Sequence, residues 1–476
     1  MIVNYQYRLY PESLQKIELN SWLRIARYWY NWQLGSRFYW WQNNRSPINA
    51  CPLICPLSEL QDKPNTYSQK RLLKEFKKEL LLVGYSGELL DFKKLPSQTL
   101  QDVSYRVDKA FNRFIVGDKN GKRSGKPRFK NQSRYRTLKI EGQGQALTIE
   151  RVEKNYMFIS ISKLKGWLKV KLHRPLPQGS IIKNALITKK ADGWYISFCL
   201  EDKTIPEFNR NEVIPTWGNT LGMDAVLHEE DYLATSDGDK LPALKSFRKS
   251  QKRLAEVSSK KAAKHKGTKA RRKLAKRESR EHQRIARSRK DHAYKTAHKL
   301  IRTGKKVFVH EKLNLQGLSK RNSAKQDKKG NYLPNGQSAK SGLNKSWQDA
   351  AFGQFFNTLQ YIAEKAGCKV IAVNPAYTSQ ILSYRDEFVF TDCSIREYFD
   401  EEIALLVDRD INAGINIKKV GLELFPTIKR RKGKPMVVEN PLTYENPATY
   451  STLKEVLKVF LPKMSEADTS PEGECP

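Results

Sequence analysis

The sequence is short of long apolar runs and of cysteine. The longest uninterrupted apolar run, Ile403 to Val407, has five residues, whereas a membrane-spanning helix needs about 20, so no membrane partner is expected. The N-terminal MIVNYQYRLYPES lacks the basic and apolar regions of a secretory signal peptide, which predicts a cytoplasmic protein. The six cysteines are scattered and form no CxxC pair, which favours reduced thiols over a disulfide scaffold.

Acidic residues are also scarce relative to basic ones. The 476 residues include 87 lysines and arginines against 50 acids, a net charge of +37. A surplus of this size predicts a polyanionic partner. With 39% hydrophobic and 10% aromatic residues, the chain has enough apolar material for cores, and its length allows two to four domains at roughly 100 to 200 residues each. Wholesale disorder is therefore excluded.

The positive charge is concentrated between Lys245 and Lys306, where 25 lysines and arginines face four acids. A solvated helix surface normally mixes both signs because like charges repel, so this stretch favours phosphate binding. Sparse apolar positions, among them Leu254, Ile285 and Leu300, predict a helical hairpin packed on a domain. Phosphate contacts carry no sequence information, so sequence reading must come from elsewhere.

Apolar periodicity outlines the rest of the chain. Residues 2–9 predict a strand, and a helix rich in aromatics follows, in which the aromatic residues from Trp22 to Trp41 fit either a helix core or base stacking. Another helix begins near Ser97, and short alternating strands cover 138–200. Strands and helices then alternate, which predicts a mixed α/β sheet.

Four acids lie at the end of an apolar strand pattern or just after one: Asp224, Glu311, Asp408 and Asp410. Singly, such acids are usually turn or cap residues. Asp224 differs because it lies within the strand pattern, where a buried carboxylate is costly unless a metal or partner compensates it. Asp410 precedes a helical pattern, so a helix N-cap is its alternative role.

The order and spacing of several motifs resemble the TnpB family, whose members are RNA-guided endonucleases encoded by insertion sequences and related to type V CRISPR effectors. The motifs similar to that family's split RuvC-type nuclease domain are GMDAVL, HEKLNLQGLSK, VNPAYTSQ and DRDINAGINI. Its N-terminal half is matched by YRLYP, LPSQTLQDVSYRVDKAF and GKPRFK. The resemblance covers about Tyr7 to Val420.

This resemblance implies a multidomain α+β protein. It would contain an RNase H-like (RuvC) α/β nuclease domain and a small β-barrel (wedge) domain with an inserted helical recognition module. The expected divisions are the first wedge strand (1–10), the helical module (11–115), the wedge domain (116–205), the nuclease domain (206–380) with its basic hairpin (245–306), a degenerate zinc-ribbon-like target-binding insert (381–407), the last RuvC motif (408–423) and a disordered tail (424–476).

The family pattern implies that Asp224, Glu311 and Asp410 are catalytic and converge on one metal site. Two Mg²⁺ ions about 3.5–4 Å apart stabilise the attacking and leaving oxygens of phosphodiester hydrolysis, and Mg²⁺ prefers carboxylate oxygens; Mn²⁺ is a possible substitute. Asp408 is a weaker candidate for a metal ligand than Asp410. Asn412 either supports the site or bonds near the helix N-terminus.

The chain departs from the family between YTSQ and the last aspartate. Family members commonly carry two CxxC pairs there, which form a zinc ribbon, but this interval contains only Cys393. No zinc is therefore expected. We expect an apolar core in its place, and whether the region still loads the target strand stays open. The predicted core residues are Tyr384, Phe388, Phe390 and Tyr398.

The function that the resemblance implies is an RNA-guided, Mg²⁺-dependent DNA endonuclease of a transposon, with a single RuvC-type active site, that cuts beside a short flanking motif. Its partners would be a noncoding guide RNA and double-stranded target DNA, with no protein partner required. A non-cleaving RNA-guided DNA-binding protein is the alternative, against which the three intact acids argue. A transposase that joins DNA ends itself would need a nucleophilic tyrosine with paired histidines, and no HxH pair occurs.

Residues for nucleic-acid contact are predicted in three places. Gln98 and Gln101 open the helix near Ser97, and glutamine can pair with adenine through two hydrogen bonds, although an exposed polar turn is the alternative. A basic loop at 116–130, rich in glycine and lysine, and the basic hairpin at 245–306 supply positive charge for phosphates. Their candidate residues are Lys126, Arg128 and Lys130 in the loop, and Arg271, Arg272, Lys273, Arg284 and Arg287 in the hairpin.

Overall fold

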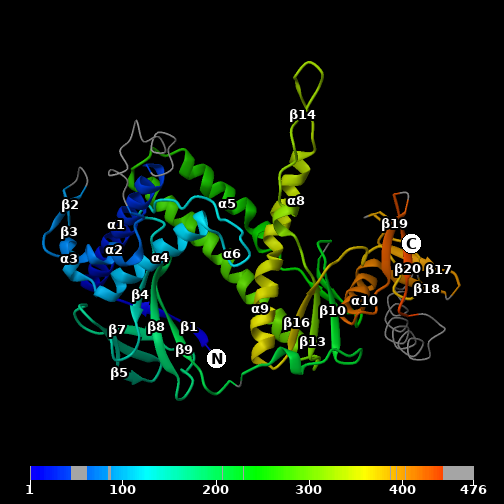
Figure 1. Cartoon of the computed structure of the whole chain (residues 1–476), viewed down its shortest axis with the longest axis horizontal. Coiled ribbons are helices and arrows are strands. Elements are labelled where there is room, and N and C mark those ends of the chain that lie inside the picture. Colours follow the sequence, from blue (N-terminus) through cyan, green and yellow to red (C-terminus); the bar gives the residue numbers. More distant parts are fainter. Residues whose placement is uncertain are drawn as a thin grey trace, which may run out of the picture. The chain divides into compact units, whose positions relative to one another are not determined.

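The computed structural model of the chain divides into two compact units, Met1–Pro206 and Glu207–Pro476. Figure 1 shows both units. The structure describes residues 2–43, 62–83, 87–205, 207–228, 230–385, 387–392, 394–402, 404–431 and 433–442.

Unit 1 is built on an antiparallel sheet of seven strands in the order β4-β8-β9-β1-β7-β6-β5. β1 lies in the middle, paired with β9 on one side and β7 on the other. The helices that follow β1 in sequence are thus inserted between strands of one sheet. Closure of edge strands β4 and β5 into a barrel stays a prediction. The strands are β1 (Ile2–Tyr10), β4 (Thr137–Glu141), β5 (Leu147–Glu153), β6 (Tyr156–Ile161), β7 (Leu168–Lys171), β8 (Ile181–Lys190) and β9 (Gly193–Glu201).

The insertion after β1 is mostly helical. Within the helical module predicted for 11–115, residues 81–90 depart from helix, because the antiparallel strands β2 and β3 form a short hairpin there. Gly87 supplies a left-handed backbone there, with φ of 61°, which a β-turn readily uses. The elements are α1 (Ser13–Asn43), α2 (Thr66–Arg71), α3 (Leu73–Phe76), β2 (Leu81–Val83), β3 (Glu88–Leu90), the 3₁₀ helix η3 (Phe92–Lys94) and α4 (Ser97–Ile115).

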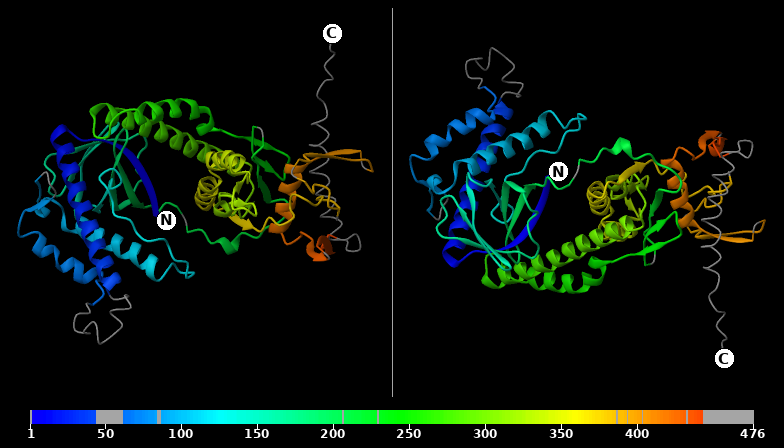
Figure 2. Two further views of the ribbon diagram at one scale, coloured as in Figure 1. Left: turned by 90° about the horizontal axis from the view of Figure 1, so that it is seen from above. Right: turned by 90° about the horizontal axis from the view of Figure 1, so that it is seen from below.

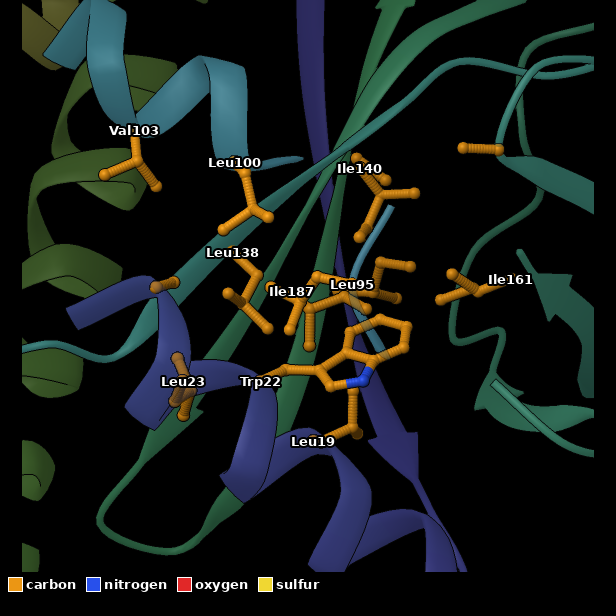
Figure 3. Close-up of a cluster of buried hydrophobic side chains, with 14 of the residues drawn as sticks. Leu19, Trp22, Leu23, Leu95, Leu100, Val103, Leu138, Ile140, Ile161 and Ile187 are labelled. Atoms are coloured by element: carbon orange, nitrogen blue, oxygen red, sulfur yellow. The ribbon is translucent and has the colours of Figure 1, made fainter. Parts of the chain in front are cut away.

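The core of unit 1 lies where α1 and α4 meet the sheet (Figure 3). Trp22 of α1 is fully buried beside apolar side chains of α4, β4 and β8. Trp29 is also fully buried, stacks on Trp32 with ring centroids 5.4 Å apart, and donates its indole N–H to the Leu100 carbonyl at 3.2 Å. These contacts assign both buried tryptophans to the helix core rather than to base stacking.

Unit 2 contains a mixed sheet in the order β12-β11-β10-β13-β16. β10 pairs antiparallel with β11 and parallel with β13, and β13 pairs parallel with β16. The mixed sheet predicted from alternating strands and helices is therefore confirmed. The strands are β10 (Thr220–Ala225), β11 (Asp231–Thr235), β12 (Lys240–Pro242), β13 (Val307–Glu311) and β16 (Lys369–Val373), and the 3₁₀ helix η4 (Arg210–Glu212) precedes them.

Helices cover both faces of this sheet. On one face, residues of α6 (Lys269–Ile301) and α9 (Phe352–Lys365) share a core with β10, β11 and β13. On the other face, α10 (Arg409–Gly421) packs through Ile415 and Ile417 against β11 and β13. Figure 1 shows α9 and α10 on opposite sides of the strands. Because both faces are covered, all five residues of β13 are buried.

The basic stretch folds as two helices, α5 (Ser246–Ala262) and α6, which run side by side in both views of Figure 2. Leu254, Val257 and Ile285 are buried along the pair. Arg253 pairs with Glu281 at 2.9 Å, and Lys261 pairs with Glu278. Two of the four acids of this stretch therefore join the two helices, and most of its lysines and arginines are exposed.

The remaining elements of unit 2 include a hairpin over 397–408, which leads into α10, and a hairpin over 427–439, which corrects a prediction. The prediction of a disordered tail from residue 424 is wrong for 427–439, where β19 and β20 pair around Gly433, whose φ is 81°. Residues 443–476 lie outside the described part of the chain. The elements are α7 (Leu315–Leu318), β14 (Lys325–Gln326), β15 (Tyr332–Leu333), α8 (Gln337–Ala350), β17 (Glu397–Asp400), β18 (Leu405–Asp408), β19 (Thr427–Arg431) and β20 (Lys434–Glu439).

Two findings concern the membrane-spanning helix and the disulfide scaffold, neither of which the sequence predicts. No helix among the described residues combines the length and the apolar composition that a membrane span requires. Cys199 and Cys368 are free thiols, and Cys368 is buried; the other four cysteines lie outside the described residues.

The backbone of α10 lies directly on β10. A Cβ atom added to Gly222 would lie 2.1 Å from the Gly414 carbonyl oxygen and 2.6 Å from the Lys418 backbone nitrogen. Neither backbone atom can move without shifting the helix. Glycine at 222 therefore sets how closely α10 approaches β10, and with it the position of Asp410.

We expect Gly222→Ala to destabilise unit 2 by at least about 1–3 kcal/mol, the usual cost of overpacking a core. Thermal unfolding followed by circular dichroism would show a lower midpoint. Gly342→Ala on α8 is the matched control, because nothing lies within 4 Å of its added Cβ. Equal midpoints for the two variants would contradict the close-packing argument.

Candidate active site

Two neighbouring parallel strands bring Asp224 and Glu311 together. Met223 of β10 is paired with His310 of β13, so the acids that follow them lie at the same end of the sheet. The Ala225 N–H donates to Glu311 Oε1 at 3.2 Å. Glu311 is buried, while Asp224 keeps partial exposure. This arrangement supports the predicted convergence of the two residues.

The N-terminus of α10 supplies the third acid. Asp408 is its N-cap, since Asp408 Oδ1 accepts from the N–H groups of Asp410 at 2.9 Å and Ile411 at 3.0 Å. Capping is therefore the task of Asp408, whose other oxygen lies 2.6 Å from Lys240 Nζ. Asp410 is buried, and its Oδ1 lies 3.0 Å from Arg396 Nη1.

Electrostatic repulsion links Asp224 to the other two acids. Loss of solvation raises the pKa of Asp224 well above its usual value, and repulsion from Glu311 and Asp410 raises it further. Burial raises the pKa of Glu311 to about 7, against the opposing Ala225 hydrogen bond. Burial and then Asp408 raise the pKa of Asp410, while Arg396 and Lys240 oppose the rise. The site therefore resists carrying three negative charges without a cation.

This donor set fits a hard divalent cation. Mg²⁺ and Mn²⁺ bind carboxylate oxygens, and a bound cation would remove the repulsion that raises these pKa values. The described residues contain no group of three or more His, Cys, Asp or Glu side chains already close enough to hold a metal. The chemistry of the residues is thus suitable, although Asp410 is engaged by Arg396.

The sequence did not reveal Arg396 and Lys240, which form ion pairs with Asp410 and Asp408. Lys240 has no sequence signal, because it reaches Asp408 only through the β11–β12 hairpin. For Arg396, the signal would have been an antiparallel pairing of 397–400 with 405–408, which the sequence analysis did not predict. In the structure this pairing aligns Glu397 with Asp408 and brings Arg396 beside the start of α10.

Other side chains near the site are structural. Asn412 accepts from the Ser383 N–H at 2.8 Å and donates to the Ile381 carbonyl at 2.8 Å, so it anchors the insert to α10. The His310 ring stacks on Phe356 with centroids 3.8 Å apart. Burial lowers the pKa of His310, which favours the neutral imidazole.

The insert before α10 (381–407) contains a small apolar core. Tyr384 and Phe390 are buried in an apolar cluster and Tyr398 packs against it, which confirms three of the four predicted core residues. Phe388 is the exception, because its ring lies against Tyr377 instead. Cys393 lies outside the described residues.

An ionic contact adds to this small core. Tyr384 donates to the buried Asp400 Oδ2 at 2.7 Å, and Arg385 pairs with both Asp400 and Glu402. Loss of solvation and the Asp400 carboxylate raise the pKa of Tyr384, so the phenol stays protonated and keeps donating.

The predicted nucleic-acid contacts in unit 1 stay predictions. Gln98 is exposed and Gln101 is half-buried at the start of α4. Lys126 and Arg128 are exposed, and the Lys126 ammonium lies 4.5 Å from the Phe38 ring centroid. Lys130 is half-buried, and its backbone N–H donates to Asn31. The Lys126 contact places a charge beside an aromatic surface, a combination that nucleic-acid sites use.

In the hairpin, one predicted contact serves the turn instead. Arg271 Nη1 donates to the carbonyls of Lys261 at 3.0 Å and Lys264 at 2.5 Å, where the end of α5 leaves carbonyls unpaired. The other predicted contacts, Arg272, Lys273, Arg284 and Arg287, are exposed on α6 and stay predictions.

Comparison with family models gives three matches in chain order. Residues 1–46 match the helix-turn-helix domain of the OrfB IS605 family, residues 201–322 match that family's probable transposase, and residues 352–417 match a Cas12f1-like TNB domain. Asp224 and Glu311 fall within the second match, and Asp410 within the third. Over the first match, the described residues form strand β1 and the single helix α1, not a helix-turn-helix.

Curated relatives share part of their length with this chain. The putative RNA-guided DNA endonuclease InsQ of Escherichia coli (strain K12) is 29% identical over 290 residues, which are 61% of this chain and 65% of InsQ. The TnpB-like protein L79 of Acanthamoeba polyphaga mimivirus is 31% identical over 143 residues, 30% of this chain and 24% of L79. The chain thus covers less than two thirds of either relative.

Solved structures with some likeness include a cryo-EM structure of a Cas12f1-sgRNA-target DNA complex, with a TM-score of 0.30, 13% identity and coverage of 88% of this chain and 99% of that one. The structure of the mini-RNA-guided endonuclease CRISPR-Cas_phi3 has a TM-score of 0.34 and 12% identity, and the match covers 69% of this chain and 66% of that one. At these TM-scores the likeness supports no conclusion about the fold.

The raised pKa of Glu311 predicts a pH-dependent stability of the metal-free protein. The folded pKa of about 7 exceeds the ordinary value of 4.5, so this group favours folding fully below pH 4.5, and that contribution is lost as pH rises through 7. The loss is on the order of 3 kcal/mol. The thermal midpoint measured in chelator should fall more steeply between about pH 5 and 8 in wild type than in Glu311→Gln. Glu439→Gln, at an exposed position of β20, should keep the wild-type slope. A Glu311→Gln slope equal to wild type would disprove the assignment.

Proposed function

We propose, from the premise that this chain belongs to the TnpB family of insertion-sequence proteins, that it is an RNA-guided, divalent-metal-dependent DNA endonuclease of a transposon. The observation that carries the proposal is a set of three carboxylates at the adjoining ends of β10, β13 and α10, in which Glu311 and Asp410 both repel Asp224. The +37 net charge supports polyanionic partners.

The three acids are the residues that would hold Mg²⁺, with Mn²⁺ as a substitute. When bound, the metal supplies stabilisation of charge on the attacking and leaving oxygens of the phosphodiester. The chain's other groups position these ligands. The Ala225 N–H orients Glu311, the Asp408 cap fixes the first turn of α10, and Lys240 neutralises Asp408.

The architecture supports the family's division of labour. A sheet with antiparallel β12-β11-β10 beside parallel β13 and β16 fits an RNase H-like (RuvC) nuclease domain. The seven-stranded sheet of unit 1, with helices inserted after β1, fits a wedge domain carrying a recognition module. Base pairing with a guide RNA would select the target, and the protein would read a short flanking motif. The exposed Gln98 and half-buried Gln101 are the proposed readers.

A non-cleaving RNA-guided DNA-binding protein is the second candidate. The ion pair between Arg396 and Asp410 favours it, because this pair engages one of the three carboxylates that hydrolysis needs. The presence of all three acids at one end of the sheet weighs against it, since a protein that never binds metal gains nothing from their repulsion.

Cleavage separates the two candidates. With the RNA that copurifies with the protein, wild type should cut matched DNA in Mg²⁺ or Mn²⁺. Asp224→Ala, Glu311→Ala or Asp410→Ala should lower the rate more than about 100-fold. Guide and target affinity measured without divalent metal should stay nearly unchanged, because nucleic-acid binding and metal binding use different residues. Glu439→Ala is the control for losing an acid. Wild-type cleavage by Asp224→Ala would overturn the metal site, and copurification of random cellular RNA alone would overturn the guided function.

The exposed charges of α6 should set the salt dependence of RNA binding. Arg272→Ala and Lys273→Ala should each remove one phosphate contact and flatten the slope of log K against log salt by about 0.7–0.9. Lys434→Ala on β20 should leave the slope unchanged. Arg271→Ala should instead lower the thermal midpoint, because its guanidinium closes the α5–α6 turn. An unchanged slope in the Arg272→Ala, Lys273→Ala double variant would make this surface of α6 a merely solvated one.

A further inference from the structure

Arg396 joins the insert to the proposed metal site. Its Nη1 lies 3.0 Å from Asp410 Oδ1, and the Asp410 side chain is 9% exposed while that of Arg396 is 35% exposed. One partner of this ion pair is therefore buried and the other reaches solvent. A charge-assisted hydrogen bond of this kind is stronger than a neutral one.

The backbone around Arg396 is fixed to the start of α10. The Arg409 N–H donates to the Arg396 carbonyl at 2.9 Å, and Arg409 Nη1 donates to the Asp392 carbonyl at 3.0 Å. The β17–β18 register then continues the attachment from Glu397 and Asp408 onward. The Arg396 side chain can swing away from Asp410 while its backbone stays in place.

Two other positively charged side chains near Asp410, those of Lys240 and Arg409, contact other groups. Lys240 is committed to Asp408 at 2.6 Å and to Asp231 at 3.3 Å. Arg409 directs one nitrogen to the Asp392 carbonyl, and its charge lowers the pKa values of Asp224 and Asp410. Arg396, by contrast, forms an ion pair with the Asp410 carboxylate itself.

We propose that Arg396 is a positioning residue that withholds Asp410 from the divalent metal until a phosphate of the bound nucleic acid takes over its guanidinium. This inference rests on the proposed function. A guanidinium binds phosphate as well as carboxylate, through two parallel hydrogen bonds. The exchange swaps one anionic partner for another, and it releases Asp410 beside Asp224, where the restored repulsion favours a divalent cation.

The exchange makes metal binding and nucleic-acid binding mutually dependent. If target DNA removes Arg396 from Asp410, then DNA tightens metal binding, and metal tightens DNA binding by the same factor. Metal would be held poorly before a target arrives. Through the Arg396 side chain, the insert would thus couple DNA binding to the metal affinity of the site.

The test measures Mn²⁺ affinity rather than cleavage. Full-length protein with its guide RNA is titrated with Mn²⁺, and free Mn²⁺ is followed by electron paramagnetic resonance, with and without target DNA phosphorothioate-substituted throughout. Without DNA, Arg396→Gln should bind Mn²⁺ about 5- to 50-fold more tightly than wild type. Target DNA should tighten binding by wild type to a similar extent and by Arg396→Gln only slightly, and Arg396→Lys should lie between them.

Arg385→Gln is the matched control, because Arg385 belongs to the same insert and pairs with acids that are not metal ligands; it should keep the wild-type DNA dependence. If Arg396→Gln without DNA binds Mn²⁺ no more tightly than wild type, the inference is overturned. If Arg396→Gln does not fold, the same comparison is made with Arg396→Lys. Tighter binding by Arg396→Gln together with no effect of DNA on wild type would overturn the phosphate exchange. If no variant binds Mn²⁺ and Asp224→Ala behaves like wild type, the proposed metal site itself fails.

Discussion

The contact between the backbones of β10 and α10 is the constraint on which the candidate site depends. Gly222 has no side chain, and the Gly414 carbonyl and the Lys418 backbone nitrogen occupy the space that a Cβ atom would need. This approach brings the first turn of α10 to the end of β10. Asp410, more than 180 positions from Asp224 in sequence, thereby comes near enough to repel it.

Around this contact the protein accumulates negative charge in a chain that is otherwise strongly positive. Asp224, Glu311 and Asp410 are held where their ionisation is disfavoured, and Asp408 adds a fourth acid that caps α10. Lys240 and Arg396 offset part of this charge through direct ion pairs. The electrostatic strain is most simply relieved by a divalent cation, which gives the metal hypothesis its physical basis.

The basic hairpin (245–306), unlike the acidic candidate site, carries mostly positive charge. Glu278 and Glu281 pair with Lys261 and Arg253 across the two helices, and Arg271 closes the turn through backbone carbonyls. These contacts use two of the four acids of the stretch to hold the two helices together. Side chains such as Arg272 and Lys273 remain on an exposed surface of one sign, which suits a phosphate backbone and cannot discriminate sequence.

The sequence by itself determined the broad organisation and the three acids. Motif order pointed to Asp224, Glu311 and Asp410, and apolar periodicity predicted the mixed sheet and the helical hairpin, because both signals are written in local residue patterns. Local patterns could not show that Arg271 belongs to a turn, that residues 427–439 form a hairpin, or that Asp408 rather than Asp410 caps α10. Those roles depend on which backbone atoms come within hydrogen-bonding distance. Only the tertiary structure decided that Arg396 contacts Asp410, because a side-chain ion pair across a hairpin requires both strands to be placed before either residue can find the other.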